Sequence, residues 1–256
     1  MLTCVALVLA AHTVSADESV LARHRRIKTP HGPIHVWTPP GYDAANAGIV
    51  LYVHGYFTDV DHAWREHHLD RQFAESGINA LFIACEAPAA PGDEVSWTSA
   101  TALLAQVETS LHEPLPDGPV VAVGHSGAHR TLSAWVGEGD AIDTIGLLDA
   151  LYGELPEIRE WIAGSQDRRL IDVGELTRPW ADQLHATLPE TKVFQRFPPR
   201  ERGHLEGART ARIVYVHSQL GHMPLVTGGV ALPMVLRASR IASLPDASRK
   251  APIRGL

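Results

Sequence analysis

Residues 119–131 read PVVAVGHSGAHRT, and the interpretation of the whole chain starts from this stretch. The apolar run VVAV is typical of a strand that is buried on both faces of a parallel sheet. Gly124, Ser126 and Ala128 follow it in the pattern G-x-S-x-[G/A], and a helix-like segment comes next. In this context the serine sits on a tight turn, which closes because the residues two before and two after it are small. Ser126 is therefore the candidate nucleophile.

A second buried strand is predicted at residues 47–53, AGIVLYV, and it ends at His54-Gly55. A serine nucleophile needs two backbone N–H groups to hold the negative charge that develops on the attacked carbonyl oxygen. One donor is expected from Gly127, directly after the serine, and the other from the loop after this earlier strand. We assign the second donor to Tyr56, with Phe57 as the alternative. The two motifs, about 70 residues apart, are more specific together than either is alone.

The serine also needs a base, which is a histidine oriented by a carboxylate. The chain has 15 histidines, but the chain order Ser, acid, His admits only late ones. Those considered are His185, in a predicted helix, His204, in a charged loop, His217, which ends a strand, and His222, in the loop beyond that strand. We favour His222, because a base reaches the serine from a loop above the strand ends, and we keep His217 as the alternative.

The orienting acid has candidates on two strands. Asp149 ends the apolar segment TIGLLD, where a carboxylate is costly to bury unless it has a partner. The next strand, RRLIDVGE, offers Asp172 or Glu175. We favour Asp149, because its apolar neighbours leave a partnered carboxylate as the explanation for its position, and Asp172 and Glu175 stay open.

Strand-like and helix-like segments alternate along the chain, which predicts the α/β class with a mostly parallel, twisted sheet and helices on both faces. Strands are expected near residues 26–29, 33–37, 47–53, 78–85, 119–123, 142–148, 169–173, 192–197 and 212–216. Helices are expected near residues 61–76, 99–111, 131–136, 156–163, 180–187 and 233–242. Only about 20 residues separate the sixth strand from the seventh, so no large cap domain is expected.

Composition excludes several function classes. Among 256 residues, 22 Lys and Arg stand against 29 Asp and Glu, and the net charge of −7 argues against a nucleic-acid partner. The sequence has no phosphate-binding loop, dinucleotide fingerprint or zinc signature, so no cofactor and no metal are expected. The His-rich stretch at residues 61–70 is interpreted as a solvated helix face, and Cys85 as a buried thiol.

The first residues resemble an export signal. An apolar run at residues 2–11 precedes Val14-Ser15-Ala16, a small-residue pattern that predicts cleavage before Asp17, although no Lys or Arg precedes the run. We therefore expect a signal peptide at residues 1–16, one domain at residues 17–256, and a periplasmic or extracellular protein. A plain N-terminal extension on a cytoplasmic protein is the alternative. No stretch approaches the ~18 apolar residues of a transmembrane helix, so no stable membrane anchor is expected.

Taken together, YVHGY and GHSGA resemble the α/β-hydrolase superfamily, in its bacterial esterase- and lipase-like branch, over nearly the whole mature chain. The segments LLDALYG and GHMPLVTGG are similar to members of the same superfamily and support Asp149 and His222. The resemblance implies a serine hydrolase without cofactors that cleaves a small-molecule ester or amide through a Ser-Asp-His triad and an acyl-enzyme. The alternatives are a catalytically inactive binding protein of the same fold and an acyltransferase with the same triad. Neither the substrate nor the oligomeric state follows from the sequence.

Overall fold

The computed structural model describes residues 22–137, 139 and 141–245, and the predicted signal peptide lies outside them. Within these residues, a nine-stranded sheet has the order β1-β2-β4-β3-β5-β6-β7-β9-β8. The strand β2 pairs antiparallel with both β1 and β4, and all the other pairs are parallel. The strands are β1 (Arg23–Ile27), β2 (Ile34–Thr38), β3 (Gly48–Val53), β4 (Ala80–Cys85), β5 (Val120–His125), β6 (Thr144–Leu148), β7 (Arg169–Gly174), β8 (Lys192–Phe194) and β9 (Ile213–His217).

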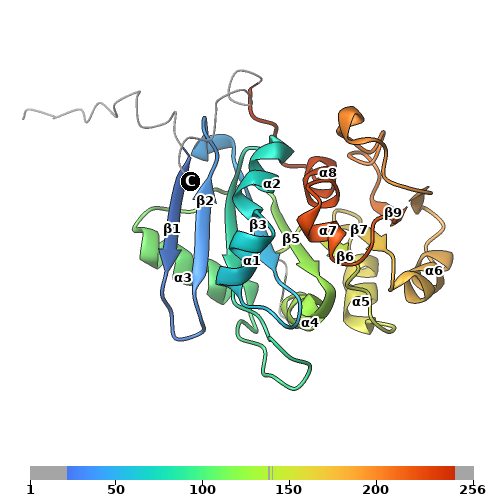
Figure 1. Cartoon of the computed structure of the whole chain (residues 1–256), viewed down its shortest axis with the longest axis horizontal. Coiled ribbons are helices and arrows are strands. Elements are labelled where there is room, and N and C mark those ends of the chain that lie inside the picture. Colours follow the sequence, from blue (N-terminus) through green and yellow to red (C-terminus); the bar gives the residue numbers. More distant parts are fainter. Residues whose placement is uncertain (1–21, 138, 140, 246–256) are drawn as a thin grey trace, which may run out of the picture.

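Helices cover both faces of the sheet (Figure 1). They are α1 (Val60–Glu66), α2 (Leu69–Ser76), α3 (Ala100–Leu111), α4 (His129–Gly137), α5 (Pro156–Gly164), α6 (Arg178–Ala186), α7 (Pro224–Thr227) and α8 (Ala231–Ala238). One apolar core contains residues of α3, α4, α5 and α6, and the other contains residues of α1, α2, α7 and α8. The predicted α/β architecture with helices on both faces is confirmed.

The central strands divide their side chains between the two cores. Every residue of β3 is buried, as the uninterrupted apolar run predicts. Because successive side chains of a strand point to opposite faces, Leu51 and Val53 join one core, whereas Val50 and Tyr52 join the other. This arrangement fixes the central strands, whose carboxyl ends carry His54, Ser126 and Asp149.

The prediction of one helix over residues 61–76 is wrong, because the chain forms two helices there. The break lies at His68, whose backbone is left-handed with φ 49°. The residue before it, His67, is buried, and its Nδ1 lies 3.1 Å from the Tyr52 hydroxyl. The interpretation of residues 61–70 as a solvated face is therefore wrong at His67, which turns into the protein.

Several strands and helices also begin or end at other residues than the sequence predicted. The first strand covers Arg23–Ile27 rather than residues 26–29, because the Gly32 N–H donates to the Thr29 carbonyl at 3.3 Å and closes a turn there. The closing helix is Ala231–Ala238, shorter at its C-terminal end than residues 233–242. Between β6 and β7 the only helix among the described residues is α5, which agrees with the absence of a large cap. None of the described helices is long and apolar enough to cross a bilayer.

Candidate active site

Ser126 stands on a strained turn between β5 and α4. Its φ of 54° lies in the left-handed region, which L-residues seldom adopt. The turn leaves no room for side chains nearby: a Cβ placed on Gly124 would lie 2.7 Å from the Ala128 Cβ, and one on Gly55 would lie 2.9 Å from the Ser126 Cβ. The pattern of small residues is therefore a steric requirement, and such strain is commonly found at functional sites.

A cavity of about 900 Å³ opens beside this turn, at the carboxyl ends of the parallel strands. Ser126, Gly127 and His222 line it together with Tyr56 and Tyr152. Ligand sites of α/β sheets occur at this edge, and the volume lies in the range of small-molecule pockets. The structure thus brings the predicted nucleophile and the favoured base to one cavity.

The favoured acid and base are hydrogen-bonded to each other. His222 Nδ1 lies 2.5 Å from Asp149 Oδ2, and the Asp149 side chain is fully buried. Three backbone N–H groups also donate to this carboxylate, those of Glu175, Leu176 and Thr177, at 2.9, 3.2 and 2.9 Å, and the Thr177 hydroxyl donates at 2.8 Å. Burial by itself would raise the pKa of Asp149, but the bonds from His222, Thr177 and Glu175 outweigh it and hold the pKa below its usual range.

A second histidine, His125, supports the loop that carries His222. The buried His125 donates from Nε2 to the His222 carbonyl oxygen at 3.2 Å, and the two rings lie 4.5 Å apart. Burial first, and then the neighbouring His222 and His67, lower the pKa of His125 to about 3. His125 is therefore neutral near pH 7 and does not place a second positive charge beside His222.

Tyr152 lines the same cavity as Ser126; burial and then the charge of Asp149 raise the pKa of Tyr152, and the Ser126 side chain offsets part of that rise. Within the described part of the chain, no hydrogen bond joins Ser126 to His222. Such bonds are often long or misaligned without substrate and tighten in the Michaelis complex. Because Nδ1 of His222 is engaged by Asp149, Nε2 is the ring nitrogen left to act as a base.

The predicted oxyanion loop follows β3. His54 fixes its start, since His54 Nδ1 lies 2.7 Å from the Gly55 carbonyl oxygen and His54 Nε2 lies 3.0 Å from both the Ala87 N and Glu86 Oε1. The Phe57 N–H is already bonded to the Ala89 carbonyl at 2.7 Å, which favours Tyr56 over Phe57 as the donor. A Cβ on Gly127 would lie 2.5 Å from the Tyr56 ring, so the two proposed donor residues are in close contact.

The alternative site residues lie elsewhere or contribute differently. Asp172 is buried under α6, where its Oδ2 lies 3.1 Å from His185 Nε2. Glu175 reaches Asp149 through its backbone N–H. His217 Nδ1 lies 3.2 Å from Arg178, and His217 is not among the residues that line the cavity. His204 contacts the Arg202 carbonyl in an exposed loop.

Sequence reasoning missed Tyr152 as a residue of the Ser126 cavity and His125 as the support of the His222 loop. Tyr152 comes three residues after Asp149, in the loop after β6, so its place at the same sheet edge was a usable signal. His125, the residue just before Ser126, carried no comparable signal. Whether His125 is buried depends on how the distant loop with His222 packs against it.

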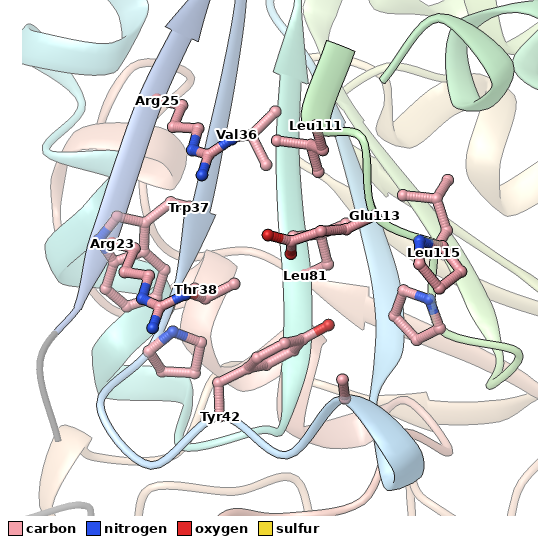
Figure 2. Close-up of a pocket in the computed structure, with 14 residues that line it drawn as sticks. Arg23, Arg25, Val36, Trp37, Thr38, Tyr42, Leu81, Leu111, Glu113 and Leu115 are labelled. Carbon is pink, nitrogen blue, oxygen red and sulfur yellow. The ribbon is translucent and has the colours of Figure 1, made fainter. Parts of the chain in front are cut away.

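A second hollow, of about 170 Å³, lies toward the other end of β4 (Figure 2). Figure 2 shows Glu113 between the arginine side chains of β1 and an apolar wall that includes Leu81 and Leu115. Burial, and then the charge of Glu113, raise the pKa of Tyr42 to about 12. This hollow has no serine, cysteine or histidine in its lining. It therefore offers no nucleophile and base for the reaction considered above.

Across residues 22–245, leaving out 138 and 140, no group of three or more His, Cys, Asp or Glu side chains is placed to hold a metal ion.

No protein-family model matches the chain. No curated protein matches it either. Solved structures do match. One is a mutant of the feruloyl esterase module from Clostridium thermocellum, complexed with sinapinate. It matches with a TM-score of 0.53 at 14% identity, over 83% of this chain and 86% of that chain. A ferulic acid esterase has a TM-score of 0.52 at 9% identity, over 84% of this chain and 97% of that one. At such identities the similarity concerns the fold, which is the α/β-hydrolase fold.

Proposed function

We propose that the protein is a serine hydrolase that cleaves carboxylic ester bonds, with Ser126 as nucleophile, His222 as base and Asp149 as the acid that orients it. The observation that carries the proposal is the hydrogen bond between the buried Asp149 carboxylate and His222 at the cavity that contains the strained Ser126. Similar structures that are feruloyl and ferulic acid esterases support an ester as the substrate.

In the proposed first step, Ser126 Oγ attacks the ester carbonyl carbon while its proton moves to His222 Nε2. The imidazolium that forms is stabilised by the carboxylate of Asp149, which its hydrogen bonds hold in the charged form. The backbone N–H groups of Tyr56 and Gly127 donate to the carbonyl oxygen as it becomes negative. When the bond to the alcohol breaks, His222 returns the proton to the leaving oxygen, and an acyl-enzyme remains.

In the second step, a water molecule attacks the acyl-enzyme. His222 takes one proton from this water and returns it to Ser126 Oγ as the carbon–oxygen bond to the serine breaks, so that the acid product and the resting enzyme are restored. Tyr152 lines the cavity that contains Ser126 and His222, so its side chain borders the bound ester.

The test is hydrolysis of 4-nitrophenyl acetate by the wild-type protein and by Ser126→Ala. The wild type is expected to turn over the ester, and the variant to lose more than about 10³-fold in kcat with little change in melting temperature. A folded wild-type protein that hydrolyses neither this ester nor any member of an ester and amide panel contradicts the proposal. Turnover that increases only when an alcohol or amine is added indicates acyl transfer instead.

We also propose, on the sequence of residues 1–16, that the protein is exported and cleaved before Asp17. Expression in a bacterial host with N-terminal sequencing of the secreted or periplasmic protein tests this. A mature N-terminus at Asp17 supports export, and an intact N-terminus on cytoplasmic protein contradicts it.

A further inference from the structure

The large apolar side chains that are exposed in the described part of the chain gather at one edge of the sheet. Four of the five follow the carboxyl ends of parallel strands, and they are Phe57, Leu176, Trp180 and Met223, with exposed fractions of 88%, 55%, 37% and 49%. Phe57 and Met223 line the main cavity. The fifth, Val193, lies on the edge strand β8 with 45% exposed. Of the four, Phe57, Met223 and Trp180 line cavities at this edge, which is where ligands of α/β sheets bind.

Trp180 lines a separate cavity of about 190 Å³ beyond the main one. This cavity lies between α6 and the segment that leads into α5, and its wall also contains Gly153, Glu154, Arg159 and Gln183. A Cβ built on Gly153 would meet no atom within 4 Å, so the space above this residue is open. A single six-membered ring fits this volume, since a cavity of about 150 Å³ accepts benzene.

Aromatic rings connect the two cavities. The Tyr152 ring lies 5.7 Å from the His129 ring on one side and 5.7 Å from the Trp180 ring on the other. Tyr152 and His129 line the main cavity together with Ser126. Tyr152 therefore lies between the main cavity and Trp180.

The polar groups around Trp180 are available to a ligand. Among the described residues, the side chains of Glu154, Arg159 and Gln183 make no hydrogen bond or ion pair within the protein. The cavity thus combines one aromatic face with free donors and acceptors at its rim. Such a combination suits a ring whose face is apolar and whose edge carries polar substituents.

We infer that the Trp180 cavity is a distal subsite that binds a ring of the substrate. This ring would lie beyond Tyr152, with its apolar face on Trp180 and its polar edge at the rim of the cavity. The inference rests on the proposed ester hydrolysis and extends it to the class of substrate. Both a hydroxylated aromatic ring and a sugar ring have this chemistry, and they are separated by the substrates of the test.

The test compares kcat/KM for ringless and ring-bearing esters. The ringless ones are ethyl acetate and ethyl butanoate, and the ring-bearing ones are ethyl 4-(4-hydroxyphenyl)butanoate, 3-(4-hydroxyphenyl)propyl acetate and 6-O-acetylglucose. The wild type is expected to prefer at least one ring-bearing ester to its ringless counterpart. The aromatic esters and the sugar ester identify which ring is accepted.

Trp180→Ala is expected to lower kcat/KM for the preferred ring-bearing ester about tenfold, through KM, and to leave ethyl acetate within twofold. Gln183→Ala removes one rim group without touching the aromatic face, and a loss of about threefold on the same ester is expected. Val193→Ala is the matched control, because it truncates an equally exposed apolar side chain on β8, and it should change neither ester.

Two results overturn the subsite: a wild type without preference for any ring-bearing ester, and a Trp180→Ala variant that loses equally on ringless and ring-bearing esters. Failure of the proposed function looks different, because the wild type then hydrolyses no ester at all. In that case, the binding of 3-(4-hydroxyphenyl)propanol is followed by tryptophan fluorescence in the wild type and in Trp180→Phe. A fluorescence change that is equal in both proteins, or absent from both, excludes binding at Trp180.

Discussion

Two buried aspartates on neighbouring strands each contact a histidine, yet their surroundings are opposite. Asp149, after β6, bonds His222 at 2.5 Å, and Asp172, within β7, lies 3.1 Å from His185. Both carboxyl groups are fully buried. From the sequence, either one was a possible partner of the base.

The difference lies in the remaining hydrogen bonds. Asp149 accepts three backbone N–H groups and the Thr177 hydroxyl, whereas Oδ1 of Asp172 is buried and has no partner among the described residues. Burial raises the pKa of Asp172, and the bond from His185 offsets only part of that rise, while the pKa of Asp149 is held low. The hydrogen bonds around Asp149 thus stabilise its charged carboxylate, whereas the surroundings of Asp172 favour its neutral form.

The comparison teaches that a buried Asp–His contact does not by itself make a catalytic pair. The proposed role needs donors that keep the carboxylate charged, and it needs a nucleophile at the same cavity. The Asp172–His185 pair has neither, and the His185 ring instead stacks on the Tyr215 ring at 4.3 Å beneath α6. We expect that pair to support packing.

The largest expected effect separates the two aspartates by activity. Asp149→Asn should lower kcat for an ester by about 10³–10⁴-fold, because it removes the charge that stabilises the His222 imidazolium. Asp172→Asn should leave kcat within about threefold. Steady-state kinetics on 4-nitrophenyl acetate measures both variants, and a loss in Asp172→Asn as large as that in Asp149→Asn would show that the wrong pair was assigned.

The same two variants should differ in how their stability depends on pH. The folded-state pKa of Asp149 lies below the unfolded value of about 3.9, so its contribution is present above that pH and is lost as pH falls through the folded pKa. Asp149→Asn should therefore cost about 2 kcal/mol at pH 7 and progressively less below about pH 4.

For Asp172 the sign is reversed. Its folded-state pKa is raised, so ionisation costs stability as pH rises from about 3.9 through the folded pKa. Asp172→Asn should gain stability relative to the wild type as pH rises. Urea unfolding at several pH values measures both trends, and trends of the same sign for the two variants would refute the contrast.

A smaller effect is expected at His125, which holds the loop of the favoured pair. His125→Phe removes the bond to the His222 carbonyl and should lower kcat about tenfold, whereas His125→Gln retains a donor and should stay within about threefold of the wild type. Labelling rates with a fluorophosphonate should follow kcat. Equal losses in both variants would mean that His125 acts through packing and not through this hydrogen bond.

The smallest effect is expected at Glu175, which the sequence offered as an alternative acid. Its backbone N–H donates to Asp149, so the side chain is dispensable for that bond. Glu175→Gln should change kcat less than about twofold. A loss near that of Asp149→Asn would return Glu175 to the position of the acid.

Local patterns were enough to predict the sheet class and the turn at Ser126. The runs at β3 and β5 are apolar throughout because both of their faces are covered, and the small residues around Ser126 reflect contacts within one turn. These features depend on neighbours in the sequence. The break at His68 was missed because it depends on His67 bonding Tyr52, which lies 15 residues earlier.

The choice between Asp149 and Asp172 shows a second limit of the sequence. Both residues follow apolar stretches, and the sequence did not show that the turn after β7 aims three N–H groups at Asp149. The roles of Tyr152 and His125 were likewise missed, because each depends on a contact between separate loops. The sequence indicated which side chains could act as nucleophile, base and acid. It did not indicate the hydrogen bonds between segments that are distant in the chain.

The central claim is that Ser126 is a nucleophile activated by the Asp149–His222 pair. The most direct measurement is reaction with a fluorophosphonate followed by peptide mass spectrometry, on the wild type, His222→Ala and His185→Ala. We expect one label on Ser126 in the wild type and in His185→Ala, and almost none in His222→Ala. A label on another residue, or equal labelling of Ser126 with and without His222, would contradict the account.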